Sequence, residues 1–474
     1  MLLQRVFIVL TIFAALVSAT CAEDSPRDER RDVNVLLISL DTLRADHVHC
    51  WGYERETTPH LDKLAAEGVL FENATAASSW TVPSHMSVFT SLYPSIHGVE
   101  DPTKCLGDGV PTMAGILSKH GYATAAFVTG SSLNHAMGFD RGFGFYDDFS
   151  VELLNEANAI GAARDLDAEE SDLNGVPTNY VITRLAADWL KKHGRRRFFL
   201  FLHFWDCHND YIPPAPYDRR FALGYRGMEN GRDIVRRREE LERNAPPEIR
   251  ERLQALYDGE IAHTDAHVGK VLAVLDELGL SDNTLVVVFS DHGEGFWEHG
   301  KILHGNGLGE ELIHVPLIFR LPGVLPDGLR MKGNVSHVDV LPTVLGLLRF
   351  PKPDPINGVD LSDVCRGDEA PPNRPVFSEL NYAGYVKRAV RWGPHKLIED
   401  RKEATRRLYV IEDGREIEAS EAERNEDDSR EAGFALTAVL NAGPSCAVAA
   451  DRLAKPAHPD EKTLRRLRSL GYMQ

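Results

Sequence analysis

Continuous apolar segments alternate along this chain with segments whose apolar residues recur at every third or fourth position. The continuous segments have the length and the Val, Ile, Leu and Phe content of strands buried on both faces, and they span residues 34–40, 198–204 and 285–289. The periodic segments predict amphipathic helices at residues 58–68, 111–121, 178–192 and 253–278. Because strands and helices that alternate in this way form parallel sheets through helical crossovers, we predict an α/β fold with a mostly parallel central sheet.

Shorter segments complete this outline. Residues 122–129 read as another strand and residues 339–348 as another helix. Glycine and aromatic residues are frequent at 138–148, which predicts a loop. Residues 229–252 are highly charged and contain few large apolar side chains, so we expect an exposed helical excursion that shapes access to a substrate.

The composition allows a large core and argues against some partners. A chain of 474 residues with 43% hydrophobic content suits one large α/β domain with a smaller appendage. The net charge of -18 argues against binding to nucleic acid or to an anionic surface. An anionic substrate would need a local positive site, which a bound metal ion supplies.

The first residues have the features of a secretory signal peptide at residues 1–22. Arg5 precedes an apolar segment at residues 6–17, and small residues follow it. The apolar segment is too short to predict a membrane span, so we expect an exported, periplasmic or secreted, protein with no transmembrane span in the mature chain. Cys21 leaves lipidation as an alternative, and residues 23–32 read as a charged spacer.

The cysteines other than Cys21 are scattered, with no CxxC pair. In an exported protein, Cys50 and Cys105 are candidates for a disulfide, although the sequence alone does not assign the pairing.

Thr81 lies just before a short apolar segment, residues 86–92, that predicts a helix. Pro83 suits the first helical position, because its missing N–H has no partner there in any case. Thr81 would then lie at the helix N-terminus, where unpaired N–H groups and the helix dipole stabilise an ionised hydroxyl, a sulfate or a phosphate. The alternative is that Thr81 is an ordinary N-cap residue.

Acidic residues end two of the predicted strands. Asp41 follows the first strand, and Asp291 and His292 follow the strand that ends near residue 290. Sites in open α/β sheets form beyond the carboxyl ends of the strands, so these side chains are expected to converge on Thr81. Two carboxylates and an imidazole suit a divalent cation.

In this order and spacing, the motifs resemble those of the sulfatase family of the alkaline phosphatase superfamily. The resemblance extends over residues 34–472 and rests on Thr81-Val82-Pro83-Ser84-His85, Ser290-Asp291-His292-Gly293-Glu294 and Glu298-His299-Gly300. It implies an alkaline-phosphatase-like α/β/α sandwich followed by a small C-terminal antiparallel sheet and a helix. The expected domains are a catalytic domain at residues 33–350, a linker at 351–374 and a C-terminal subdomain at 375–474.

The resemblance also implies one divalent metal ion, which would be calcium in a sulfatase and manganese or zinc in a phosphoesterase. Its ligands would be Asp41, Thr81, Asp291 and His292. Many sulfatases have a second acid where this chain has Thr42, so the site either loses a ligand or keeps a weaker hydroxyl.

Relatives with two metals raise the alternative of a second ion at Asp206, His208 and His304. The Asp-x-His spacing in this chain is tighter than in those relatives, which favours a single metal.

Family resemblance assigns roles to several histidines. His208 would be the general acid that protonates the leaving-group oxygen, with a structural loop histidine as the alternative. His85 and His304 would donate hydrogen bonds to the anion. His299 is expected to brace its loop, and His263 with its i+4 neighbour His267 is expected to pack behind the sheet.

Thr81 departs from the family pattern. Sulfatases need a cysteine or serine here, which is oxidised to formylglycine, whereas oxidation of a threonine would give a ketone. A covalent ester of Thr81 must instead be cleared by water attacking the sulfur or phosphorus, and phosphodiesterases and phosphoethanolamine transferases of the superfamily use threonine in this way. Family membership thus points to sulfate esters and the nucleophile to phosphate or phosphonate esters, and both remain open.

The expected reaction is metal-assisted in-line displacement by Thr81 on a sulfated or phosphorylated small molecule or glycan. A different class of function is a pseudoenzyme that binds anionic glycans without turnover. The sequence specifies neither the substrate nor the oligomeric state.

Overall fold

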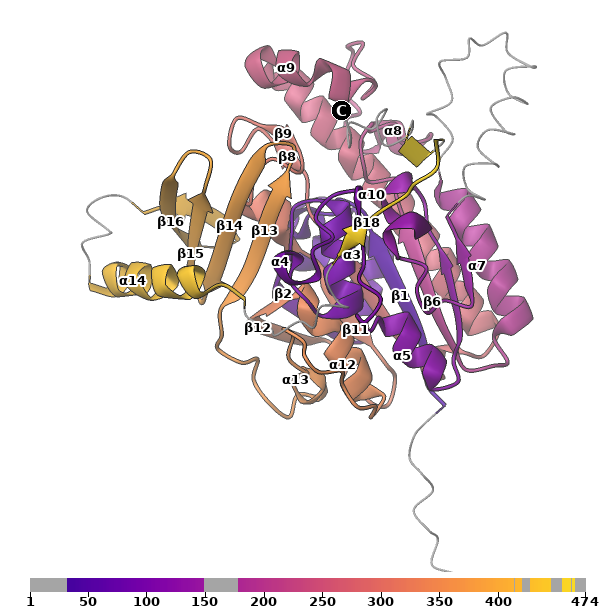
Figure 1. Cartoon of the computed structure of the whole chain (residues 1–474). Coiled ribbons are helices and arrows are strands. Elements are labelled where there is room, and N and C mark those ends of the chain that lie inside the picture. Colours follow the sequence, from indigo (N-terminus) through magenta and orange to yellow (C-terminus); the bar gives the residue numbers. More distant parts are fainter. Residues whose placement is uncertain are drawn as a thin grey trace, which may run out of the picture.

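The computed structural model describes residues 32–148, 178–412, 414–419, 427–444, 454–461 and 463–464. Its main body is a nine-stranded sheet with helices on both faces, and a five-stranded sheet lies beside it (Figure 1). The strands of the main sheet are β1 (Asn34–Leu40), β2 (Val69–Thr75), β4 (Ala123–Phe127), β5 (Phe145–Asp147), β6 (Phe198–Phe204), β7 (Thr284–Ser290), β10 (His314–Val315), β11 (Leu317–Arg320) and β12 (Leu329–Ser336).

Most of the main sheet is parallel. Its order is β10-β2-β11-β7-β1-β6-β4-β5, with β12 paired to β2. The five strands β7, β1, β6, β4 and β5 run parallel, and β11 enters antiparallel between β2 and β7. The predicted α/β fold with a mostly parallel central sheet is therefore confirmed.

The central strands are buried on both faces, which explains their unbroken apolar sequences. On β1, Val35 and Leu37 point into one core, whereas Leu36 and Ile38 point into the core on the other face. The first core is completed by α3 (Thr81–Thr90), α5 (Met113–Lys119) and α12 (Val340–Leu347). The second is completed by α2 (Pro59–Ala66), α7 (Asn179–His193) and α10 (Pro247–Glu277).

Short elements connect this framework. The remaining α-helices of the described residues before the C-terminal sheet are α4 (Pro94–His97), α8 (Tyr217–Arg220), α9 (Ile234–Asn244), α11 (Glu310–Ile313) and α13 (Ser362–Arg366). Two small ribbons pair β3 (Lys104–Cys105) with β18 (Lys455–Pro456) and β8 (Gly295–Phe296) with β9 (Ile302–Leu303). The charged segment before α10 forms α9, which projects from the body as the expected excursion (Figure 1).

The second sheet is an antiparallel meander of β13 (Val376–Tyr382), β14 (Tyr385–Trp392), β15 (His395–Asp400), β16 (Thr405–Glu412) and β17 (Arg415–Glu418). Leu436 and Leu440 of the helix α14 (Asp427–Ala442) pack against it. The end of β13 reaches the segment before α3, where Tyr382 stacks on Trp80 with ring centroids 4.2 Å apart. The C-terminal sheet therefore supports the start of α3.

Three local predictions are wrong. The helix expected from Pro83 already begins at Thr81, with Trp80 in the extended conformation as its N-cap. The long helix expected from residue 253 begins at Pro247, because a proline is well suited to the first turn of a helix. The loop expected at residues 138–148 contains the edge strand β5, which pairs with β4.

Cys50 and Cys105 are free thiols, so the candidate disulfide is wrong. Cys50 packs against the core that contains α10, whereas Cys105 lies beside Gly138. The predicted signal peptide and all of the spacer except Asp32 lie outside the described residues. Within the described part of the chain, none of the helices has the length and apolar character needed to cross a membrane.

Candidate active site

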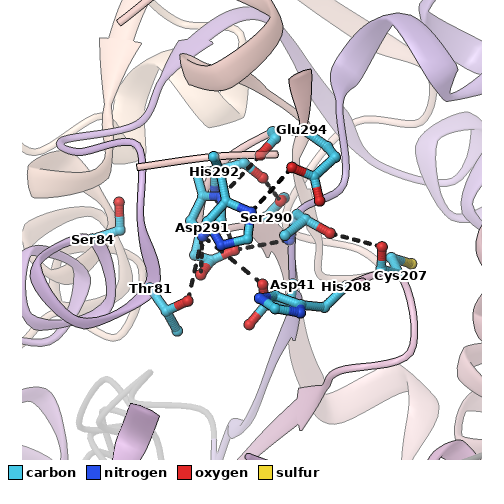
Figure 2. Close-up of polar contacts among 12 residues, drawn as sticks. Asp41, Thr81, Ser84, Cys207, His208, Ser290, Asp291, His292 and Glu294 are labelled. Carbon is cyan, nitrogen blue, oxygen red and sulfur yellow. Dashed lines mark hydrogen bonds and ion pairs between the residues drawn. The ribbon is translucent and has the colours of Figure 1, made fainter. Parts of the chain in front are cut away.

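Four side chains meet at the carboxyl end of the main sheet (Figure 2). Asp41 directly follows β1, and Asp291 and His292 directly follow β7. Because Leu40 pairs with Ser290 in the parallel register, the two aspartates leave the sheet side by side. Thr81 is the first residue of α3, and its Oγ1 lies 3.3 Å from Nε2 of His292. All four side chains are fully buried.

Asp41, Asp291 and His292 offer ligand atoms that lie within 4.8 Å of one another. Nε2 of His292 is 3.9 Å from Oδ1 of Asp41 and 3.4 Å from Oδ2 of Asp291. The other ring nitrogen of His292 donates to the carbonyl of Gly293 (2.9 Å), so the lone pair of the neutral ring is on Nε2 and faces the carboxylates.

Two carboxylate oxygens at this point have no partner. Within the described residues, Oδ1 of Asp41 and Oδ2 of Asp291 are buried and accept no hydrogen bond. Buried polar atoms are normally paired, and a divalent cation satisfies orphaned carboxylate oxygens together with an imidazole lone pair. The residues present therefore fit the metal ion that the resemblance implies.

The other two carboxylate oxygens are held by the surrounding chain. Oδ1 of Asp291 accepts the backbone N–H of Thr42 (3.1 Å) and of His292 (2.9 Å). Oδ2 of Asp41 lies 3.0 Å from Nε2 of His203, a residue on β6 for which the sequence predicted no role here. The feature that could have indicated this role is the position of His203 on the strand next to β1, where it pairs with Ser39.

The two aspartates differ in how readily they ionise. Burial and the neighbouring Asp291 raise the pKa of Asp41 well above its usual value. Burial also opposes ionisation of Asp291, but His292 and His85 together lower its pKa to about 2. A bound dication would favour the ionised form of both carboxylates.

Thr42 provides no ligand to this site. Its backbone is left-handed (φ +56°), and its hydroxyl donates to the carbonyl of Cys207 at 2.9 Å. The sequence left open whether Thr42 is a weak hydroxyl ligand or no ligand at all, and the structure agrees with the second.

The predicted contact between His85 and a bound anion is wrong. His85 lies one turn after Thr81 on α3, and its ring contacts Phe201 of β6 and Phe289 of β7 in the sheet. Its Nδ1 bonds to the Thr81 carbonyl (2.9 Å) and its Nε2 to the hydroxyl of Ser39 (2.8 Å), so both ring nitrogens serve the protein. Burial lowers the pKa of His85 to about 3, which makes it a neutral support for the first turn of α3.

His208 and His304 complete the site. Their rings meet edge to face at 4.7 Å, and the His304 ring also lies 4.5 Å from that of His292. His208 stacks on Trp205 (3.8 Å), and its Nδ1 donates to the carbonyl of Asn209 (2.9 Å). Burial lowers the pKa of both rings well below the usual value, and each is lowered further by a neighbouring histidine.

Glu294 is a site residue to which the sequence analysis gave no role, although it belongs to the motif that follows β7. Its Oε1 lies 3.0 Å from Nδ1 of His304, and its side chain is fully buried. Burial raises the pKa of Glu294 to about 7. Glu294 therefore orients His304 and can hold a proton near neutral pH.

The alternative second metal set of Asp206, His208 and His304 does not form. Asp206 instead accepts the N–H groups of Thr178 and Asn179 at the N-terminus of α7 (2.9 and 3.0 Å). The chain makes a tight turn over residues 205–208, in which the N–H of His208 donates to the carbonyl of Trp205. Asp206 and His208 therefore point to different elements.

The chain matches known proteins over most of its length. The sequence profile of the sulfatase family matches residues 33–350. The ulvan-active sulfatase of Formosa agariphila is 27% identical over 369 residues, covering 76% of this chain and 70% of that protein. The N-acetylglucosamine-6-O-sulfatase of Bacteroides thetaiotaomicron is 22% identical over 435 residues, covering 77% and 76%.

Among solved structures, the phosphonate monoester hydrolase of Agrobacterium radiobacter has a TM-score of 0.71 at 19% identity, covering 86% of this chain and 95% of that one. This likeness shows the fold. Together, the family match over two thirds of the sequence and the strand-end site show that the chain belongs to the sulfatase family of the alkaline phosphatase superfamily, whose members hydrolyse sulfuric or phosphoric esters.

Proposed function

We propose that this protein hydrolyses sulfate, phosphate or phosphonate esters by direct attack of the Thr81 hydroxyl on the sulfur or phosphorus. The observation that carries the proposal is the position of Thr81 Oγ1, 3.3 Å from Nε2 of His292 and beside the carboxylates of Asp41 and Asp291, each of which has an oxygen without a hydrogen-bond partner in the described residues (Figure 2). An ordinary N-cap threonine would accept a backbone N–H of its own helix, whereas here Trp80 is the N-cap residue.

Asp41, Asp291 and His292 would hold the divalent cation. When bound, it would lower the pKa of the Thr81 hydroxyl and offset charge on the transferred group. Thr81 also lies at the N-terminus of α3, where the first N–H groups of the helix and its dipole favour an anion at the same place. His85 keeps this first turn in position through the Thr81 carbonyl.

Thr81 gives up its hydroxyl proton to solvent before the attack. The first half of the reaction then forms a Thr81–O–S or Thr81–O–P bond and breaks the bond from the same sulfur or phosphorus atom to the ester oxygen. The leaving alkoxide takes a proton from His208. Nδ1 of His208 is engaged by a carbonyl, so the transferred proton is on Nε2. An anionic ester next to His208 raises its pKa, which loads this proton when substrate binds.

The second half releases Thr81. Water attacks the sulfur or phosphorus and breaks its bond to Thr81, which yields inorganic sulfate, phosphate or the free phosphonate and restores the deprotonated Thr81 oxygen for the next turnover. His208, now neutral, takes the proton from this water, and Glu294 keeps His304 oriented at the site.

Sulfate esters and phosphorus esters are both supported. The family profile and the curated relatives favour a sulfate ester of a glycan. The threonine favours a phosphate or phosphonate ester, because it cannot become formylglycine, and the phosphonate monoester hydrolase neighbour is in line with that chemistry.

The test is a set of assays on the full mature chain with aryl sulfate, aryl phosphate monoester, aryl phosphodiester and aryl phosphonate, each with Ca²⁺, Mn²⁺ or Zn²⁺. Thr81→Ala is compared with Thr90→Ala, which removes a buried hydroxyl from the other end of the same helix. We expect turnover in the parent and in Thr90→Ala and its loss in Thr81→Ala. Turnover that survives in Thr81→Ala would overturn the nucleophile, and a parent that binds these anions without turnover would favour the pseudoenzyme.

A further inference from the structure

A second group of potential metal ligands lies where the loop between β8 and β9, here called the active-site loop, meets the C-terminal sheet. His299 comes from the loop between β8 and β9, Glu311 from α11 and Glu416 from β17. Each offers a ligand atom within 4.8 Å of the others. None of these residues takes part in the proposed reaction.

The distances in this group suit a tetrahedral ion. Nε2 of His299 is 3.5 Å from Oε2 of Glu311 and 3.3 Å from Oε2 of Glu416. Zinc bound tetrahedrally to nitrogen and oxygen places neighbouring ligand atoms about 3.3–3.5 Å apart. A single N–H on Nε2, by contrast, can be directed at only one of the two carboxylates.

Apart from His299, the carboxylates of this group have one cationic partner among the described residues, Lys396. The Glu416 side chain is only 4% exposed, and its Oε2 accepts no hydrogen bond from the described residues. The other oxygen of Glu416 pairs with Lys396 (3.0 Å). For Glu311, His299 is the only basic side chain of the described residues that lies within ion-pair distance.

The local charge is also unbalanced. Three carboxylates meet here, because Glu310 binds Arg391 and Lys396 next to Glu311 and Glu416. Two basic side chains therefore face three acidic ones as long as His299 is neutral. Hydrogen bonds to Glu311 and Glu416 raise the pKa of His299 to about 10, so a proton on its ring balances this charge when no ion is bound. The His299 side chain is 46% exposed, so an ion can reach it from solvent and a water molecule can complete the coordination.

We propose that His299, Glu311 and Glu416 bind one Zn²⁺ ion that fastens the active-site loop to the C-terminal sheet. The competing occupant is a proton on His299, which the same two carboxylates favour. Binding of Zn²⁺ displaces that proton and joins β8–β9, α11 and β17 through one centre. The site is separate from Thr81, so the proposal stands or falls independently of the reaction.

The test counts zinc ions by equilibrium dialysis of the full mature chain at pH 8 and follows thermal unfolding in the same samples. His299→Ala is the main variant, and Glu311→Gln is the second if the first folds poorly. Asp291→Asn removes a ligand of the Thr81 site. His49→Ala is the matched control, because His49 is 45% exposed and pairs with a single carboxylate, Asp62.

We expect two equivalents of Zn²⁺ in the parent and in His49→Ala, and one equivalent in His299→Ala, in Glu311→Gln and in Asp291→Asn. Zinc should raise the unfolding temperature less in His299→Ala than in the control. Equal stoichiometry in His299→Ala and the parent, with an equal zinc-dependent rise, would overturn the proposal and leave a protonated His299 between two carboxylates. Loss of the Thr81 site alone would show in Asp291→Asn and would not affect this comparison.

Discussion

Replacing Asp41 by Asn should stabilise the metal-free protein and destroy its response to metal. Asp41 and Asp291 have ligand oxygens within 4.8 Å of each other, in a fully buried site where both must be ionised to bind a cation. At an effective dielectric constant of about 20, two unit charges at this distance repel by about 3 kcal/mol. Without a cation, folding must either accept this repulsion or take up a proton on Asp41. The amide introduced by Asp41→Asn avoids both costs and can donate to His203, which lies 3.0 Å from the native carboxylate.

The assay is thermal unfolding of the chelator-treated mature chain and of the same protein with Ca²⁺, Mn²⁺ or Zn²⁺. In chelator, Asp41→Asn should unfold several degrees above the parent. At about 100 times the dissociation constant, a metal should stabilise the parent by about 2.7 kcal/mol and leave Asp41→Asn nearly unchanged. The order of stability should therefore approach equality or reverse when metal is added.

Asp265→Asn is the control for a buried aspartate. Asp265 accepts the N–H groups of His60 and Leu61 and is remote from the Thr81 site, so its loss should destabilise the protein equally with and without metal. The reasoning is refuted if Asp41→Asn is less stable than the parent in chelator, or if metal stabilises both proteins by the same amount.

Three further outcomes follow from the site and its supports. His208→Ala should slow the first turnover of alkyl esters by about 10²–10⁴-fold and that of nitrophenyl esters far less, because only the poorer leaving group needs the proton; equal losses in the first-turnover rate for both would contradict the acid role. Glu294 has a folded pKa of about 7 against an ordinary value of 4.5, so its contribution to stability is full below pH 4.5 and is lost as pH rises to 7. In chelator, Glu294→Gln should therefore lose about 3 kcal/mol less unfolding free energy than the parent between pH 4.5 and pH 7. Denaturant titrations at the two pH values measure this difference, and an unchanged pH dependence in Glu294→Gln would contradict the raised pKa. Lys396→Met should cost about 3–5 kcal/mol of unfolding free energy, because Glu310 and Glu416 stay buried without their shared cation; a loss below about 1 kcal/mol would mean that solvent reaches them.

The strand-end residues could be predicted because their positions follow from the backbone alone. An apolar strand that is buried on both faces has one carboxyl end, and parallel strands bring these ends together. Asp41 and Asp291 could therefore be placed side by side without any knowledge of side-chain direction. The same reasoning placed Thr81 near them once its helix was expected.

The side chains that were misplaced depend on local turns that the sequence pattern does not reveal. Asp206 and His208 are two residues apart, yet the tight turn after β6 sends one to the N-terminus of α7 and the other to His304. His85 follows Thr81 by one helical turn, so it faces the sheet whenever Thr81 itself begins the helix. The role expected for His85 came from the family resemblance, which does not fix the direction of this side chain.

The central claim is that Thr81 forms a covalent bond to the group it transfers, and a rapid-quench experiment tests it most directly. The mature chain would be mixed with its best ester substrate, quenched in acid during the first turnover, digested and examined by mass spectrometry. We predict a sulfuryl or phosphoryl group on Thr81 in the parent, which accumulates in His208→Ala with aryl substrates because water is no longer activated. Turnover at the same rate with Thr81 unmodified at every quench time would contradict the account.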